Sequence, residues 1–164
     1  MAKQAKTNAM RFLESHKIAY TAHEYPHEEG MAVDGVTVAE SMNEDPRDVF
    51  KTLVTQGADK NFFVFVIPVA EELDLKAAAR SVGQKNVAMI PVASLLKTTG
   101  YIRGGCSPVG MKKQFATVFD ASALTREKMF VSGGRIGTQI CCAPADLIGA
   151  VRGLTADLTQ HRAD

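Results

Sequence analysis

The chain has 164 residues, of which 46% are hydrophobic and 23% are charged. This composition is typical of a globular protein and excludes the disordered, collagenous and disulfide-scaffold classes. Nineteen basic and eighteen acidic side chains leave a formal net charge of +1, so a polyanionic partner would have to bind a local patch of positive charge. The length predicts a single domain over residues 1–164 with a hydrophobic core of its own.

Cysteine usage and the first residues bear on the cellular compartment. Cys106, Cys141 and Cys142 form neither a CxxC motif nor a zinc-binding spacing, which favours a reducing compartment. Residues 1–17 carry charges throughout, and nowhere do about 18 apolar residues follow one another, as a membrane span requires. We therefore expect a cytoplasmic protein without a membrane partner.

The first half of the chain predicts helices and a β-hairpin. Apolar spacing predicts an opening helix up to Leu13, a strand over residues 18–25 and a second helix over residues 36–42. Residues 45–48 then read as an N-cap aspartate, a first-turn proline and a second acid. After them, residues 49–69 contain two segments rich in Val, Phe, Ile and Thr with a break at Gly57–Asn61, which predicts two antiparallel strands.

The second half adds short elements separated by turn residues. Asp74 is placed to cap a helix that runs to Val82 and stops at Gly83. The remaining expected elements are a strand at 87–90, a helix at 91–96, glycine-punctuated loop and strand at 101–110, strands at 115–119, 129–132 and 136–141, and an amphipathic helix at 147–158. Because short strands outnumber helices, the pattern favours an α+β fold in which a curved mixed sheet packs against helices.

Lys51 is the most unusual residue of the predicted strands. It shares one face with Val49 and Leu53, while the residues between them face the other way, so its neighbours are apolar on either side. An ammonium group among apolar groups must reach water or bind an anion, because burying it unpaired is costly. Lys51 is therefore either an edge-strand lysine that reaches solvent or a lysine of a binding site.

Two glycine-rich segments form the second signal, Gly104–Gly110 and Ser132–Gly137. Glycine allows backbone N–H groups to approach a carboxylate, a phosphate or a developing oxyanion closely. Neither segment is a Walker loop, because the GK[ST] ending is absent from both. Each is either a simple turn or one wall of a small pocket.

No set of residues predicts a catalytic triad or a metal site. The four histidines lie in the first 27 residues and at position 161, and no HExxH motif or calcium loop is present, so neither a metal nor another cofactor is expected. Cys106 is the only candidate nucleophile, because its thiol lies in a glycine loop next to Arg103. The alternative is that Cys106 is a small buried apolar residue.

Five short motifs follow one another in a fixed order. They are Lys51-Thr52-Leu53, Leu73-Asp74-Leu75-Lys76, Thr99-Gly100-Tyr101, the segment 104–113 and Ser132-Gly133-Gly134. In this combination they resemble the YbaK/EbsC family of aminoacyl-tRNA deacylases, relatives of the editing domain of bacterial prolyl-tRNA synthetases. The resemblance extends over nearly the whole chain.

The resemblance implies a compact fold with a mixed, partly barrel-like sheet and a pocket for the aminoacyl end of tRNA. It implies a trans-editing enzyme that removes cysteine from mischarged Cys-tRNA(Pro), with Cys-tRNA(Cys) as a further candidate substrate. The implied partners are the acceptor end of aminoacyl-tRNA and prolyl-tRNA synthetase, and no DNA. The thiol of the esterified cysteine would attack its own carbonyl, so the enzyme needs no nucleophile of its own.

The resemblance also assigns roles to individual residues. Lys51, Gly104 and Gly105 would be the catalytic residues, with the two glycines holding the ester through backbone N–H groups. The residues implied to bind substrate are Tyr20, Ser107, Ser132, Gly133 and Gln139. This sequence departs from the family pattern at Gln139, where an aspartate is expected, and the loss of that carboxylate bears on amino-acid specificity.

Two other functions remain open from the sequence. A hydrolase that uses Cys106 on a small ester or thioester would account for a thiol in a glycine loop. A degenerate editing domain that binds aminoacyl-tRNA without turnover would account for Gln139 at the position of the expected acid.

Overall fold

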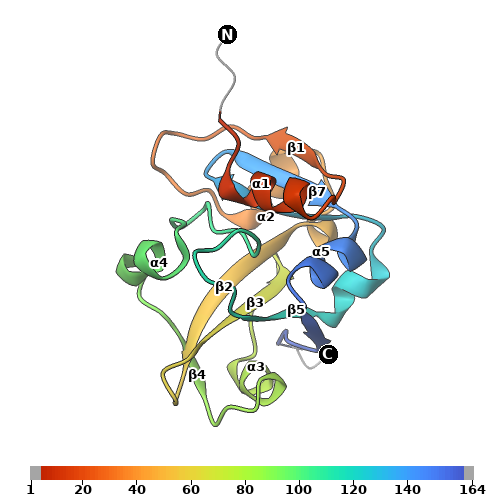
Figure 1. Cartoon of the computed structure of the whole chain (residues 1–164). Coiled ribbons are helices and arrows are strands. Elements are labelled where there is room, and N and C mark those ends of the chain that lie inside the picture. Colours follow the sequence, from red (N-terminus) through yellow and green to blue (C-terminus); the bar gives the residue numbers. More distant parts are fainter. Residues whose placement is uncertain (1–4, 161–164) are drawn as a thin grey trace.

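The computed structural model describes residues 5–160, in which helices surround two β-sheets (Figure 1). The α-helices are α1 (Asn8–Ser15), α2 (Gly35–Ser41), α3 (Leu75–Ser81), α4 (Val92–Thr99) and α5 (Pro144–Ala150), with short 3-10 helices η1 (Pro46–Asp48) and η2 (Ala121–Thr125). The strands are β1 (Thr21–Glu24), β2 (Phe50–Gly57), β3 (Phe62–Pro68), β4 (Val87–Met89), β5 (Ala116–Asp120), β6 (Met129–Arg135), β7 (Thr138–Cys142) and β8 (Leu154–Ala156).

The strands form a five-stranded sheet in the order β4-β2-β3-β5-β8 and a three-stranded sheet in the order β1-β7-β6. The predicted hairpin of β2 and β3 is antiparallel, whereas β5 pairs in parallel with both β3 and β8. The two sheets meet at an isolated parallel bridge between Val49 and Phe130. The predicted α+β class with a mixed sheet is confirmed, and the sheet consists of two parts joined at this bridge.

Local sequence signals explain where several helices begin. The Asp74 carboxylate accepts hydrogen bonds from the backbone N–H groups of Lys76 and Ala77, as an N-cap residue does. Asp45 accepts in the same way from Arg47 N, directly before Pro46. Both predicted caps are therefore confirmed.

The predicted final helix over residues 147–158 is wrong. Helix α5 ends at Ala150, Arg152 has a positive φ of 53°, and the chain then forms β8 beside β5. A Cβ atom at Gly153 would lie 2.7 Å from the Phe119 ring, so the chain that leaves the helix packs directly against a side chain of β5. The expected strand within residues 101–110 is also absent, because this segment is loop throughout.

The largest buried cluster lies between the two sheets. It includes Phe50 and Val66 from the five-stranded sheet and Val131 and Ile140 from the three-stranded sheet, and α1, α5 and the loop around Cys106 pack against it. A second cluster lies between the five-stranded sheet and α3, around Phe65 and Leu158. Figure 1 shows the three-stranded sheet and α1 above, the five-stranded sheet below and α4 to one side. Among residues 5–160, no helix has the length and apolar character needed to cross a membrane.

Candidate functional site

The candidate site lies along an unpaired edge of β2. On this edge β6 is bridged to the chain at Val49, and β4 pairs only from Thr55 onward. Val49 O accepts a hydrogen bond from Val69 N, so alternation along the strand turns the backbone groups of Phe50 and Thr52 away from β3 and toward this edge. Within the described residues, the edge from Lys51 to Leu53 has no strand partner.

A cavity of about 120 Å³ opens where β2 and β6 separate. Val49 and the first three residues of β2, Phe50, Lys51 and Thr52, all line it, because it lies beside the strand edge rather than over one face. The lining residues are Tyr25, Val33, Gly35, Val38, Val49, Phe50, Lys51, Thr52, Val69, Gly104, Cys106, Ser132 and Gln139. The structure thus brings Lys51, Gly104, Ser132 and Gln139 to one cavity, although they come from three distant parts of the sequence.

Lys51 is half-buried at the wall of this cavity. No carboxylate forms an ion pair with its ammonium group among the ion pairs of residues 5–160. Burial lowers the pKa of Lys51 below its usual value, and the negative charges of Glu72 and Glu71 act in the opposite direction. The cavity therefore contains a cation that is partly desolvated and able to bind an anionic or carbonyl oxygen.

The charge of Glu72 partly offsets the effect of burial on the pKa of Lys51, and this can be tested. Replacing Glu72 with glutamine removes the larger acidic contribution that favours the ammonium form, so we expect the pKa of Lys51 to fall further below its usual value. An NMR titration of the Lys51 side chain measures the shift, and Glu127→Gln, which changes an exposed acid that does not act on Lys51, is the matched control. An unchanged Lys51 pKa in Glu72→Gln would contradict the electrostatic account.

The same shift makes stability depend on pH. Because the pKa of Lys51 is lower in the folded protein than in the unfolded chain, the unfolded chain binds more protons between the two values. The contribution of Lys51 to the free energy of unfolding therefore rises with pH across that window. Below the folded pKa, the penalty for holding the buried ammonium is constant.

The two glycine-rich turns pack against each other through their backbones. A Cβ atom at Gly105 would lie 2.9 Å from Arg135 Cα, and one at Gly104 would lie 2.8 Å from Ala32 Cβ. Gly104 also has a positive φ of 84°, which favours glycine. The contact of Gly105 with Arg135 and that of Gly104 with Ala32 leave no room for a side chain at either position, and together they hold this turn at the cavity wall.

The two glycines differ in what their N–H groups can do. Gly105 N donates a hydrogen bond to Ile102 O at 2.9 Å, so this amide closes the turn and is not available to a ligand. No partner for Gly104 N is found within the described part of the chain. Of the two backbone amides that were expected to hold the ester, only that of Gly104 therefore remains a candidate.

Two buried polar atoms of the cavity lack a hydrogen-bond partner. They are the amide oxygen of Gln139, a residue that is 6% exposed, and the hydroxyl of Thr52. Gln139 lies opposite Ser132 in the β6–β7 register and opposite His23 in the β1–β7 register. Leaving a buried polar atom unpaired is costly, and a ligand in the cavity would supply the missing partners.

Three of the predicted binding residues lie elsewhere. The hydroxyl of Tyr20 donates to Glu14 at 2.6 Å on the outer side of α1, so Tyr20 does not line the cavity. Ser107 is fully buried behind the loop, where its hydroxyl lies 3.5 Å from Val109 N as a hydrogen-bond acceptor. Gly133 is directed toward Thr138 of the neighbouring strand. Strand register and loop packing, rather than position in a motif, decide these placements.

The sequence analysis missed Tyr25 and Thr52. Tyr25 follows β1, and its backbone N–H donates to Gly137 O at 2.9 Å, which anchors this part of the chain. The residue is only 5% exposed and lines the cavity. Burial raises the pKa of Tyr25 above its usual value, so its hydroxyl remains protonated. For Thr52 the available signal was its place next to Lys51 on a strand whose two faces are both apolar.

Cys106 lines the cavity but is a poor nucleophile. Burial raises the pKa of its thiol to about 12, and Thr99 opposes this shift only partly. The reactive thiolate is therefore scarce near neutral pH. The structure supports the reading of Cys106 as a small buried apolar residue.

The remaining lining restricts the chemistry further. It contains no carboxylate and no histidine, so no carboxylate or imidazole from the described residues faces the cavity as a general acid or base. In the same part of the chain, no three His, Cys, Asp or Glu side chains are grouped so that they could hold a metal ion. The arrangement offers a cation, a backbone amide and neutral hydrogen-bonding groups, which bind and orient a substrate.

Comparison of the sequence with known families and proteins gives two matches. Residues 27–150 match the model of the aminoacyl-tRNA editing domain. Over 156 residues, the chain is 44% identical to an Enterococcus faecalis protein named "Putative Cys-tRNA(Pro)/Cys-tRNA(Cys) deacylase EbsC", with 95% of this chain and 94% of that protein covered.

Comparison with solved structures identifies the same fold. One match is the structure titled "Crystal structure of a putative trans-editing enzyme for prolyl tRNA synthetase", with a TM-score of 0.80, 22% identity and coverage of 96% of this chain and 100% of the other. Another is a scaffold protein used for epitope backbone grafting, with a TM-score of 0.83, 21% identity and coverage of 94% and 96%. At these identities the likeness establishes the fold alone.

Proposed function

The chain belongs to the aminoacyl-tRNA editing domain family, and from this membership we propose that it is a trans-editing deacylase that removes cysteine from mischarged Cys-tRNA(Pro). Cys-tRNA(Cys) is a second substrate under this proposal. The observation that carries it is the cavity, in which Lys51 and Gly104 lie with two unpaired polar side chains, and in which the one thiol, Cys106, has a raised pKa and no histidine or carboxylate beside it in the lining to activate it. Such a cavity suits a reaction in which the substrate supplies the attacking atom.

The proposed reaction is intramolecular. The sulfur of the esterified cysteine forms a bond to its own carbonyl carbon, and the bond from that carbon to the ribose oxygen breaks. The thiol proton ends on the ribose oxygen, which gives free tRNA and a cyclic thioester of cysteine that water then hydrolyses. Holding the two reacting groups in line contributes about 7–11 kcal/mol to such steps, so positioning is the main task of the enzyme.

Each cavity residue has a defined part in that task. Under this proposal, the N–H of Gly104 stabilises the oxyanion that forms on the carbonyl. Lys51 contributes a positive charge toward the carbonyl or the terminal ribose and phosphate. The amide oxygen of Gln139 accepts a hydrogen bond from the substrate ammonium group, with Tyr25 and Ser132 beside it.

The experiment that tests the function is a deacylation assay with tRNAs charged with cysteine, alanine, serine or proline. We expect cysteine to be released fastest, because only its side chain carries a thiol that can attack the ester. Spontaneous hydrolysis without protein is the control. Release of all four amino acids at the spontaneous rate would contradict the proposal and favour a module that binds aminoacyl-tRNA without turnover.

Replacing Cys106 with alanine separates the proposal from a cysteine hydrolase. If the substrate supplies the nucleophile, Cys106→Ala retains deacylation to within about one order of magnitude, because it removes only one buried sulfur atom. Loss of an enzymatic nucleophile instead lowers kcat by about 10⁴-fold or more. Measuring kcat on Cys-tRNA(Pro) distinguishes the two, and a loss of the larger size would establish Cys106 as the nucleophile.

Prolyl-tRNA synthetase is the proposed partner in this reaction. The net charge of +1 gives little general attraction to polyanions, so the affinity for free tRNA is expected to be modest and to fall steeply with salt. A synthetase that holds the mischarged tRNA would supply the specificity that this small chain lacks. Addition of prolyl-tRNA synthetase to the assay should therefore raise the rate at physiological salt.

A further inference from the structure

A second cavity lies on the same free edge of β2, and we propose that it binds the terminal nucleobase of the aminoacyl-tRNA; this inference rests on the function proposed above. The cavity has a volume of about 180 Å³ and begins where the first one ends. It is lined by Leu53 and Val54 of β2, by Met89 at the end of β4 and Ile90 directly after it, and by Val92 and Leu95 of α4.

The two cavities share one wall. Thr52, Gly104 and Cys106 line both of them, so the loop that carries the glycines separates one compartment from the other. In charged tRNA the amino acid, the ester, the ribose and the base follow one another along the molecule. A substrate with its aminoacyl group in the first cavity and its ester beside Gly104 therefore continues across this wall into the second cavity.

The lining of the second cavity suits a nucleobase. Six aliphatic or thioether side chains form it, and such side chains pack against the flat apolar faces of a base. The cavity is lined by no acidic residue, and its single charged lining residue, Arg103, is exposed at the rim. A guanidinium at this position can bind the phosphate that precedes the terminal nucleoside.

The shared wall also contains an unpaired hydroxyl. The Thr52 Oγ1 atom is buried and has no hydrogen-bond partner, and Thr52 lines both cavities. A ribose that crosses the wall would bring its hydroxyl and ester oxygens to this atom. The unpaired hydroxyl is thus placed where the sugar between the amino acid and the base would lie.

Exposed apolar side chains mark the entrance. Met89 is 48% exposed and Val92 is 60% exposed, and both line the cavity. Figure 1 shows α4 beside β2, with the segment that follows α4 crossing in front of that strand. Apolar side chains grouped at a cavity next to a site are a sign of ligand contact, and a stacked base would cover them.

Two substrates and two matched variants test the inference. The substrates are 3′-cysteinyl adenosine, which has the base, and cysteine methyl ester, which lacks it. Val92→Glu introduces a carboxylate at the entrance, at the first position of α4, where an acid is compatible with the helix dipole. Leu124→Glu makes the same change at a residue that is 61% exposed and lines neither cavity.

We expect the ratio of kcat/KM for cysteinyl adenosine to that for the methyl ester to fall about tenfold or more in Val92→Glu, the size of effect expected when the apolar contact of one valine side chain with the base is lost. Leu124→Glu should keep the wild-type ratio. An unchanged ratio in Val92→Glu, or an equal loss on both substrates, would overturn the inference.

A binding measurement keeps the inference testable without turnover. Adenosine 5′-monophosphate, added to the full chain with labelled methionine methyl groups, should shift the Met89 signal and leave that of Met31, which is exposed elsewhere, unchanged. The shift should be lost in Val92→Glu. Absence of a shift in the wild type would overturn the base site, whereas a shift in a protein that cleaves no ester would retain the site and refute the proposed activity.

Discussion

Lys51→Ala is expected to lower the deacylation of Cys-tRNA(Pro) by about 10²–10³-fold, the cost of removing one group that stabilises charge in a transition state. The ammonium is the only positive charge in the cavity lining of the described residues, so no other lining residue can replace it. Single-turnover release of cysteine measures the loss. Undiminished turnover would place Lys51 outside the reaction.

Charge and shape can be separated at this position. Lys51→Met keeps the length of the side chain and removes the charge, so it should lose as much activity as Lys51→Ala. Because burial disfavours the ammonium, Lys51→Met should also raise Tm, which would show that the charge is kept for function at a cost to stability. An activity close to wild type in Lys51→Met would mean that the stem, not the charge, matters.

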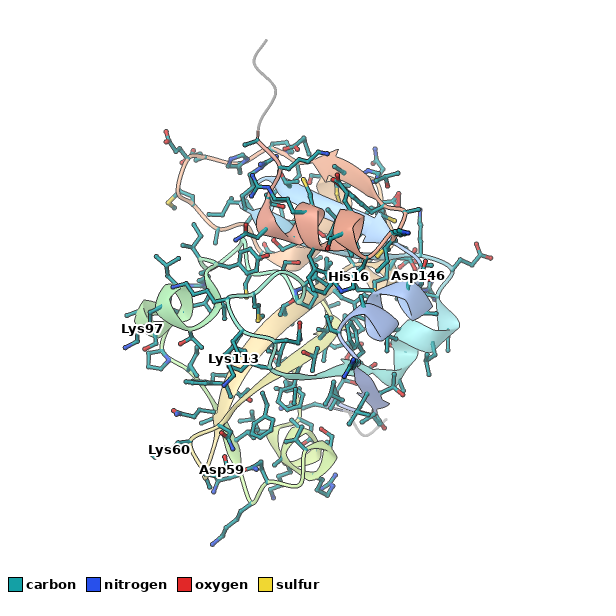
Figure 2. The ribbon with its side chains drawn as sticks, in the orientation of Figure 1. His16, Asp59, Lys60, Lys97, Lys113 and Asp146 are labelled. Carbon is teal, nitrogen blue, oxygen red and sulfur yellow. The ribbon has the colours of Figure 1, made fainter. Side chains whose placement is uncertain are left out.

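Lys60→Ala is the control for both variants. Lys60 lies on the same hairpin, at its exposed tip, as Figure 2 shows. It lines neither cavity, so its replacement should leave both activity and Tm within error of the wild type. A loss comparable to that of Lys51→Ala would point to a general effect of lysine charge on tRNA binding.

Gly105→Ala is expected to lower kcat by about 10²-fold, because displacements of about 1 Å can cost that much in catalysis. The added Cβ would lie 2.9 Å from the backbone of Arg135, and a backbone contact cannot be relieved by rotating a side chain. The turn that holds Gly104 must therefore move away from the second glycine turn. Such overpacking destabilises by about 1–3 kcal/mol, which the midpoint of urea unfolding measures.

Gly149→Ala provides the matched glycine control. A Cβ at Gly149, in α5, would meet nothing within 4 Å. Alanine is favoured over glycine in a helix by about 0.5–1 kcal/mol, so this variant should be slightly more stable and fully active. If Gly105→Ala behaves like Gly149→Ala, the contact between the two turns does not position the site.

Features that depend on neighbours in sequence were predictable. Three features arise from residues within a few positions of one another. They are the helix caps at Asp74 and Asp45, the β2–β3 hairpin, and the placement of the Lys51 ammonium group among apolar neighbours. Capping hydrogen bonds and side-chain alternation act over these short distances, and tertiary packing does not alter them here. The α+β class follows from the same local patterns.

The final helix shows where local pattern is insufficient. The apolar residues of 147–158 have helical spacing, yet the chain leaves α5 at Ala150 and forms β8 beside β5. Pairing with a strand some 35 residues earlier in the chain, and the close approach of Gly153 to Phe119, determine this outcome. Neither interaction leaves a signal in the periodicity.

The amino-acid sequence alone determines three features of this protein. They are a lysine that must contact an anion or water, two glycine-rich turns, and the ordered motifs that resemble one family. Tertiary structure alone decides that Tyr25 rather than Tyr20 reaches the cavity, and that Gly105 N–H is occupied by Ile102. It also decides that a second cavity adjoins the first along β2. The physical reason is that a cavity forms where neighbouring segments are not in contact. The position of such a gap depends on strand register and on backbone contacts between residues far apart in the chain.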